Sequence, residues 1–214
     1  MQKWQNKFEE WWHGNESDDA SHDLGHFRRV YKMAIRISEM DQVDADPLVL
    51  MAAAYFHDVV NPPKDSDLRS QASRLAAEKT REILREMNFP PEKIDGVAHA
   101  VLAHSFSAAI PAETIEAKVI QDADRMESLG AMGVARNMYV SGRMGSSMFH
   151  PDDPMAESDR EYEDSRYALD HYELKLFKLP EMMQTPAGQK IAQERVQYLR
   201  EYQERLRQEI LGEV

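Results

Sequence analysis

Apolar residues recur at intervals of three and four along most of the chain, which is the period of an amphipathic α-helix. Val30, Met33 and Ile37 are one example. The alternation of apolar and polar positions that is typical of strands is nearly absent. We therefore expect an all-α fold. Helices are expected at about 2–12, 23–41, 47–59, 69–88, 91–104, 113–129, 130–142, 160–178 and 186–211.

Proline and glycine mark the breaks between these segments, as at Asn61-Pro62-Pro63 and Phe89-Pro90-Pro91. The longest irregular stretch spans about residues 142–158 and is rich in Gly, Ser, Asp and Pro. It has two interpretations, a mobile flap over a site or a surface loop.

The length of 214 residues suits one domain, 1–214. We expect a metal-binding core at about 20–130, with C-terminal helices at about 160–212 packing on it. The chain has no cysteine, which excludes disulfides, thiolate metal sites and a cysteine nucleophile. No apolar run approaches the roughly twenty residues of a membrane span, so a cytoplasmic protein that binds no membrane is expected.

Acidic residues outnumber basic ones by 38 to 26, which gives a net charge of −12. This charge repels nucleic-acid backbones, so duplex nucleic acid is not an expected partner. A phosphorylated small molecule is repelled too, unless a metal ion and a few placed cations offset the repulsion.

Three short motifs place histidine and aspartate beside apolar helix patterns: His22-Asp23-Leu24-Gly25-His26, His57-Asp58 and Asp122-Ala123-Asp124. His26 lies on the apolar stripe of its helix, and His57-Asp58 follows a continuous apolar run. Asp124 lies within a helical segment, where a buried carboxylate is costly unless a cation compensates it. Imidazole and carboxylate together suit a divalent ion.

Each motif alone has a structural interpretation. His22 and Asp23 can cap a helix, His57-Asp58 can be a solvated helix end, and Asp122 can pair with Arg125 at the surface. The three motifs together favour a metal site.

The order His26, His57-Asp58, Asp124 resembles the H…HD…D signature of the HD superfamily of metal-dependent phosphohydrolases. Longer stretches resemble its small bacterial YedJ- and YpgQ-like branch. They are residues 22–30, 103–107, 121–131 and 167–176. The resemblance implies an all-α HD fold and gives the metal-ligand role to His26, His57, Asp58 and Asp124.

Some HD nucleotidases have a catalytic glutamate three residues after the HD aspartate, where this chain has Asn61. We therefore expect a metal-activated water assisted by another group, with Asp23, His22 and His104 as candidates. Asp23 can equally cap its helix. We expect one divalent ion, Mn²⁺ or Mg²⁺ before Co²⁺, Ni²⁺, Zn²⁺ or Fe²⁺, although His99 and His104 could hold a second.

Substrate phosphate requires cations and hydrogen-bond donors. The candidates are Arg69, Ser73, Arg125, His171 and Lys175. The family resemblance favours Arg69 and Ser73, and it favours an inward Lys175, although that side chain could also extend to the surface. Arg125 can face the site or pair with Asp122.

By analogy with the superfamily, we expect a nucleotide partner and hydrolysis of a nucleoside triphosphate to the monophosphate and pyrophosphate. Two alternatives remain. One is a helical iron-dependent oxygenase on the same scaffold, which would use a di-iron site with extra histidines. The other is a regulator that binds nucleotide without cleaving it.

Overall fold

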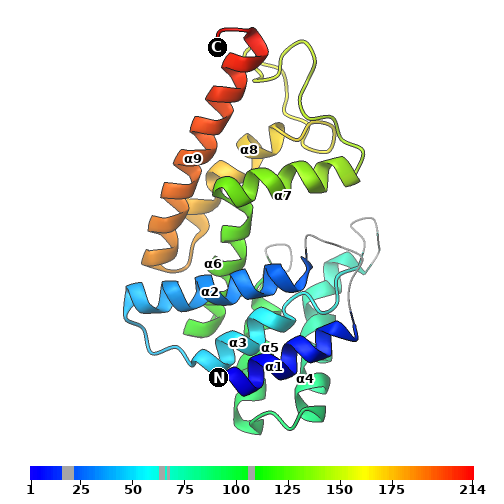
Figure 1. The fold of residues 1–214 in the computed structure, drawn as a ribbon, viewed down its shortest axis with the longest axis vertical. Coiled ribbons are helices and arrows are strands. Elements are labelled where there is room, and N and C mark those ends of the chain that lie inside the picture. The colour runs from blue at the N-terminus through cyan, green and yellow to red at the C-terminus, as the bar shows by residue number, and fades with distance from the viewer. Residues whose placement is uncertain (16–21, 63–65, 67, 106–108) are drawn as a thin grey trace. The chain divides into compact units, whose positions relative to one another are not determined.

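The computed structural model describes residues 1–15, 22–62, 66, 68–105 and 109–214. Nine α-helices and three short 3-10 segments make up the regular structure of these residues, which confirms the all-α prediction (Figure 1). The chain forms two compact units, Met1–Asp124 and Arg125–Val214. Each unit has its own set of packed helices.

The first unit contains the six helices that precede the Asp124–Arg125 boundary, the last of which runs one residue past it. They are α1 (Gln2–His13), α2 (Leu24–Asp41), α3 (Pro47–Phe56), α4 (Ala72–Glu86), α5 (Pro91–Ala103) and α6 (Ile115–Arg125). A 3-10 turn, η2 (Arg69–Gln71), precedes α4. Two aspartates begin helices as their side chains predict, because Asp23 caps α2 and Asp46 caps α3.

Helix α3 is the centre of the first unit. Every residue from Val49 to Phe56 is buried, and α3 packs against both α2 and α5. A helix that is apolar on all sides belongs in a core, which explains the continuous apolar run in the sequence. The helix was expected to continue to residue 59, but it ends at Phe56. His57, the C-cap, keeps the helical hydrogen bond to Ala53 O, and the chain leaves the helix after it.

The second unit begins with η3 (Met126–Ser128) and α7 (Gly130–Arg143). It continues through α8 (Asp170–Leu174), η4 (Leu176–Met182) and α9 (Pro186–Leu211). Both α7 and η4 pack against α9. The expected helix 113–129 is α-helical only over Ile115–Arg125 and continues as the 3-10 turn η3. It ends at the predicted residue, because Leu129 is extended and Gly130 takes a positive φ of 69° close to the Arg195 side chain.

The expected helix 160–178 is wrong. Residues 160–169 form turns and loops, and regular α-helix covers only Asp170–Leu174. The reason is a buried ion pair: Arg160 donates two hydrogen bonds to the Asp170 carboxylate, at 2.6 and 2.7 Å, and the Glu163 amide adds a third at 2.7 Å. A helix would place these groups along one axis, so the pairing requires the chain to fold back.

The stretch 142–158 is organised by its own hydrogen bonds. Asp153 accepts from the amides of Glu157 and Ser158, and His150 Nδ1 accepts from the amides of Asp152 and Asp153. These bonds fit the surface-loop interpretation. The flap interpretation stays a prediction.

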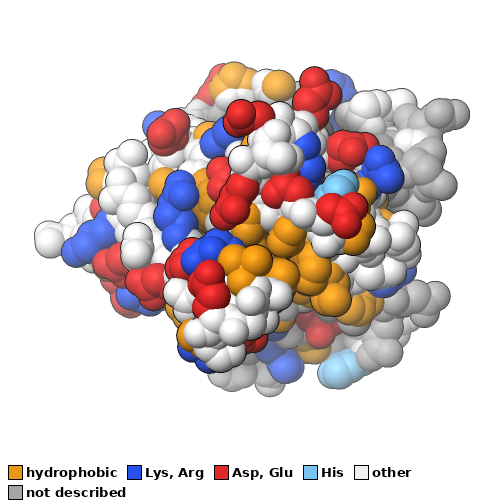
Figure 2. Space-filling model, turned by 90° about the horizontal axis from the view of Figure 1, so that it is seen from above, with side chains coloured by type: hydrophobic (Ala, Val, Ile, Leu, Met, Phe, Trp, Pro, Cys, Tyr) orange, Lys and Arg blue, Asp and Glu red, His pale blue; other side chains and the backbone are white. Residues whose placement is uncertain are grey.

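The surface carries interspersed charges. On the face shown in Figure 2, basic side chains lie among acidic ones around a patch of hydrophobic side chains. Of the helices that the structure describes, none combines the length and the hydropathy needed to cross a bilayer.

Candidate metal centre

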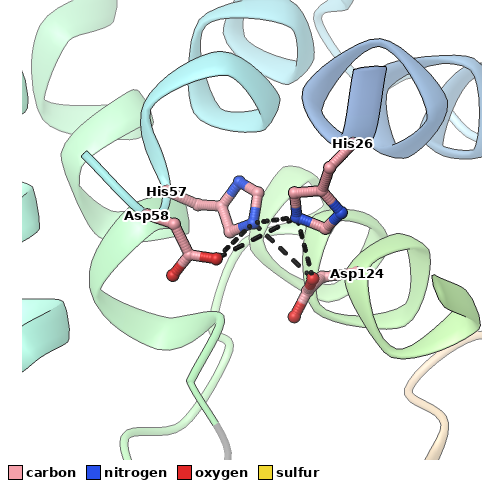
Figure 3. Close-up of side chains that lie close together, drawn as sticks. All are labelled: His26, His57, Asp58 and Asp124. Atoms are coloured by element: carbon pink, nitrogen blue, oxygen red, sulfur yellow. Dashed lines mark hydrogen bonds and ion pairs between the residues drawn. The ribbon is translucent and has the colours of Figure 1, made fainter. Parts of the chain in front are cut away.

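Four side chains from three helices converge in the first unit (Figure 3). His26 lies in the first turn of α2, His57 caps the C-terminus of α3 with Asp58 next to it, and Asp124 is in the last turn of α6. One ligand atom from each lies within 4.8 Å of all the others. Among the described parts of the chain, no other group of histidine and acidic residues converges in this way.

The spacing of the donor atoms is short. His26 Nε2 lies 3.1 Å from His57 Nε2 and 3.6 Å from Asp124 Oδ1. His57 Nε2 is 3.2 Å from Asp58 Oδ2 and 3.5 Å from Asp124 Oδ1. All four side chains thus point toward one position between them (Figure 3).

Helix ends supply this arrangement. The Asp23 carboxylate accepts the His26 amide at 2.7 Å, which fixes the first turn of α2 and with it the fully buried His26 ring. At the end of α3, the His57 amide still bonds to Ala53 O, so the helix delivers His57 inward before the chain turns at Asp58. Adjacent residues can therefore both face the same position.

The His57 ring is oriented by the backbone. Its Nδ1 lies 2.9 Å from the Ala54 carbonyl oxygen, which can only accept a hydrogen bond. Nδ1 therefore carries the proton, and in the neutral ring Nε2 presents its lone pair to Asp58, Asp124 and His26. A backbone contact of this kind is typical of metal-binding histidines.

The electrostatics of the cluster favour a cation. Complete burial by itself would lower the pKa of His57, but the Asp58 and Asp124 carboxylates outweigh burial and raise this pKa to about 10. Burial would raise the pKa values of Asp58 and Asp124, yet the neighbouring imidazoles hold both well below the usual range. The Asp58 and Asp124 carboxylates are therefore held in the charged form, and they attract a positive charge to the point where the four side chains meet.

The donor set fits a divalent metal ion. It combines two imidazole nitrogens with two carboxylate oxygens. Among the described residues, every ion-pair partner of Asp58 and Asp124 is a histidine. Two carboxylates this close together are costly unless a cation lies between them. Nitrogen and oxygen ligands suit Mn²⁺, Mg²⁺, Zn²⁺, Fe²⁺ and related ions, so the geometry does not select one metal.

Two further histidines flank Asp58. His22 Nε2 lies 3.4 Å from Asp58 Oδ2, and His104 Nε2 lies 3.5 Å from Asp58 Oδ1. The structure thus brings two of the three candidate catalytic side chains to the cluster. The third, Asp23, caps α2, which accounts for an aspartate at that position.

Two residues near the centre escaped the sequence analysis as contributors. Asn61 Nδ2 lies 3.0 Å from His22 Nδ1, and Gln121 donates to the Ala103 carbonyl at 2.7 Å, linking α6 to the end of α5 just before His104. Gln121 is 5% exposed. A polar residue within the apolar pattern of α6 was the available signal, whereas nothing local indicated the pairing of Asn61 with His22.

The candidate substrate residues lie in different places. Ser73 is buried in the first turn of α4. The backbone of Arg69 begins η2, but its side chain is outside what the structure describes. Arg125, His171 and Lys175 belong to the second unit, so their role toward a substrate at the cluster stays a prediction.

Within the second unit, these three residues have structural settings. Arg125 donates a hydrogen bond to the Met182 carbonyl, and His171 Nδ1 lies 2.8 Å from Asp164 Oδ2. Helix α8 ends at Leu174, and Lys175 is its exposed C-cap. Whether this side chain faces a substrate or extends to the surface stays a prediction. Asp122 is fully buried, which does not fit the surface setting of its alternative role as a partner of Arg125.

Comparison with known proteins agrees with this geometry. The HD domain family model matches residues 23–129, half of the chain. The uncharacterized protein YpgQ of Bacillus subtilis is 28% identical over 199 residues, covering 91% of this chain and 87% of that protein.

Solved structures extend the match to nearly the whole chain. Bacillus subtilis YpgQ in complex with ADP is 29% identical with a TM-score of 0.73, covering 97% of this chain and 98% of that one. A Bacillus thuringiensis protein described as an HD-superfamily hydrolase is 31% identical with a TM-score of 0.70, covering 96% and 97%. The chain therefore belongs to the HD family and is a metal-dependent phosphohydrolase of the HD superfamily.

Proposed function

We propose that the protein hydrolyses a nucleoside triphosphate to the monophosphate and pyrophosphate. The observation that carries the proposal is the convergence of His26, His57, Asp58 and Asp124 on one position. The choice of a nucleotide is supported by YpgQ, a relative of similar length whose structure contains ADP.

In this proposal the four converging side chains hold one divalent ion. A divalent ion lowers the pKa of a water that it binds toward neutrality and polarises a phosphoryl oxygen. The protein must then orient that water and accept its proton. Two histidines lie close enough to Asp58 to do so, and their hydrogen bonds differ.

His104 has the hydrogen-bonding pattern of a base. Its Nδ1 lies 2.5 Å from the Val101 carbonyl oxygen, so Nδ1 carries the proton and the neutral ring leaves Nε2 as an acceptor. Nε2 faces Asp58 Oδ1 at 3.5 Å, so the carboxylate would stabilise the ring once Nε2 has taken up a proton. We assign His104 Nε2 as the acceptor of the proton from the attacking water.

His22 has the opposite pattern. With the Asn61 amide nitrogen donating to Nδ1, the neutral ring carries its proton on Nε2 and donates toward Asp58 Oδ2. His22 therefore positions the Asp58 carboxylate and is not available as a base. Asn61, which stands where some HD nucleotidases have glutamate, acts through His22 in this assignment.

The reaction balances with these groups. The water oxygen bonds to the α-phosphorus, one water proton passes to His104 Nε2, and the bond from that phosphorus to the oxygen bridging to the β-phosphoryl breaks. Pyrophosphate leaves with that bridging oxygen. No residue of the chain needs to form a covalent intermediate.

One ion suffices for this assignment. His99, the other candidate ligand for a second ion, accepts the Glu113 amide at its Nε2 at 3.1 Å. Asn61 offers no carboxylate. We expect metal analysis of protein purified without chelator to give about one equivalent per chain, whereas two would favour the di-iron oxygenase arrangement.

The test is a panel of nucleoside mono-, di- and triphosphates incubated with Mn²⁺, Mg²⁺ or Co²⁺, with product masses measured. The proposal expects a nucleoside monophosphate and pyrophosphate in equal amounts. Release of inorganic phosphate from monophosphates alone would instead identify a nucleotidase. Binding of nucleotide without any product would favour the regulator alternative.

A further inference from the structure

A small recess adjoins the metal centre on the side of Asp58. Its volume is about 40 Å³. It is lined by His57, Asp58, Val60, Ala72, Ser73, His104 and Ser105. The lining is mostly polar, and it joins the end of α3 to the first turn of α4 and to the end of α5.

Ser73 is the unexplained polar group of this recess. The residue is 5% exposed, yet its hydroxyl has no hydrogen-bond partner among the described residues. Its oxygen is not among the fully buried unpaired atoms of the described residues, so in the free protein a water in the recess can hydrogen-bond to it and a ligand can displace that water. A hydroxyl that opens into a recess beside a metal centre can donate its proton to a ligand there.

The start of α4 adds to this preference for an anion. Helix α4 is 15 residues long and begins at Ala72, and its N-cap residue Gln71 makes no side-chain capping bond. The positive end of the helix dipole therefore meets the recess without a carboxylate cap to offset it. The Asp58 carboxylate opposes an anion, so we expect anion binding to depend on the loaded metal centre.

Size restricts what can enter. Pockets that bind drug-sized molecules measure about 300–1,000 Å³, so a nucleoside does not fit in the recess. A single phosphoryl group has the charge and acceptor atoms that Ser73 and the α4 N-terminus favour. Because the recess lies next to Asp58, a phosphoryl group bound in it would be adjacent to the phosphoryl group that the water attacks at the metal centre.

We propose that the recess binds a second phosphoryl group of the substrate, one that is not attacked, with Ser73 as its hydrogen-bond donor. This inference rests on the proposed phosphohydrolase reaction and restricts it to substrates with at least two linked phosphoryl groups. The nucleoside then lies outside the recess. Pyrophosphate, which can reach from the metal centre into the recess, binds more tightly than inorganic phosphate.

The test compares Ser73→Val, which fills the recess, and Ser73→Ala, which removes only the donor, with the parent. Ser70→Val and Ser70→Ala are matched controls, because Ser70 is exposed and precedes α4 in the same segment. The readouts are the affinity of Mn²⁺-loaded protein for inorganic pyrophosphate and for inorganic phosphate by calorimetry, KM for a nucleoside triphosphate, metal content and melting temperature.

We expect Ser73→Val to weaken pyrophosphate binding and to raise KM at least about tenfold, as for loss of a hydrogen bond to a charged group. Metal content should stay that of the parent, and the Ser70 variants should behave like the parent. Ser73→Ala should also weaken pyrophosphate binding and raise KM. If Ser73→Val has a lower melting temperature than the parent, the alanine variant provides the test.

The outcomes separate the two proposals. Triphosphate cleavage with unchanged KM and pyrophosphate affinity in both Ser73 variants overturns the recess and leaves the proposed function standing. Loss of pyrophosphate binding in the Ser73 variants of a protein that cleaves no triphosphate supports the recess and overturns the proposed function. Equal affinities of the parent for pyrophosphate and phosphate also overturn the recess.

Discussion

The two units each contain low-exposure aspartates, and the partners of these aspartates differ. In the second unit, Asp170 is 2% exposed and receives two hydrogen bonds from Arg160. In the first unit, Asp58 and Asp124 face imidazole rings, and all their ion-pair partners among the described residues are histidines. A carboxylate paired with the chain's own arginine holds the fold together. Two carboxylates facing only imidazoles form a site for a cation that the chain does not supply.

The largest expected effect comes from weakening the cation site. Asp124→Asn removes one of its two negative charges, so metal content should fall well below one equivalent and kcat/KM should drop by more than about 100-fold. Loss of an outer partner of a metal ligand alone costs about 10–100-fold. Metal analysis and kinetics measure this. Asp95→Asn is the control, because the Asp95 side chain is 89% exposed. A fully loaded, active Asp124→Asn protein would contradict the assignment.

The next effect concerns the structural aspartate. Asp170→Asn leaves the Arg160 charge, with its side chain only 14% exposed, with only the more distant Asp153 carboxylate at 3.9 Å as a charged partner. Breaking such a pair costs about 3–5 kcal/mol of unfolding free energy. Urea unfolding of the metal-free protein measures it, with exposed Asp152→Asn as control. Metal content of the folded variant should remain that of the parent. If Asp170→Asn lost metal but kept its unfolding free energy, Asp170 would belong to the metal site and would not stabilise the fold.

A smaller effect is expected beside the cluster. Asn61→Asp replaces the donor to His22 Nδ1 by an acceptor, so the neutral ring should move its proton to Nδ1 and turn a lone pair toward Asp58. We expect kcat/KM to fall about tenfold, at the low end of the effects of outer partners of metal ligands. The ¹⁵N shifts of the His22 ring report the tautomer directly. An unchanged tautomer in the variant would refute the role given to Asn61.

The smallest effect concerns a partly exposed pair. Glu9 accepts from Arg28 at 2.6 and 2.8 Å and from the Tyr55 hydroxyl at 2.7 Å. The Arg28 hydrogen bonds, against a smaller effect of burial, lower the pKa of Glu9 from 4.5 to about 2. Because the Arg28 side chain is 45% exposed, we expect Glu9→Gln to cost only about 1 kcal/mol at pH 7.

The sign of its pH dependence follows from the lowered pKa. The ionised pair contributes fully above pH 4.5 and is lost as the pH falls toward 2. The stability difference between parent and Glu9→Gln in urea should therefore shrink over that interval. Glu10→Gln, an exposed neighbour on α1, is the control. A difference that does not change with pH would mean that the charge contributes nothing.

Sequence patterns predicted most helices because their signals are local. Asp23 and Asp46 begin α2 and α3, and the apolar stripe of α9 runs to Leu211 where the structure ends it. The helix expected at 160–178 failed because the Arg160–Asp170 pair joins residues ten positions apart and competes with the helical ladder. Helical periodicity carries no information about such a pairing.

The candidate site likewise has features that local sequence patterns predict and features that depend on contacts between distant segments. His26, His57, Asp58 and Asp124 could be predicted to converge because each follows or interrupts an apolar helix pattern. The contact of His22 with Asn61, and the recess at Ser73, depend on how loops and helix ends meet. Those relations arise only from the packing of α3, α4 and α5.

The burial of α3 on all sides bears on how the first unit opens. Its amide hydrogens have no route to solvent through fraying of an exposed face, so we expect them to exchange with deuterium only when the unit opens as a whole. An ion bound at His57 and Asp58 stabilises the closed state by mass action. Exchange throughout α3 should then slow by one common factor that grows with metal concentration, so that the helix directly before two of the ligands reports their occupancy.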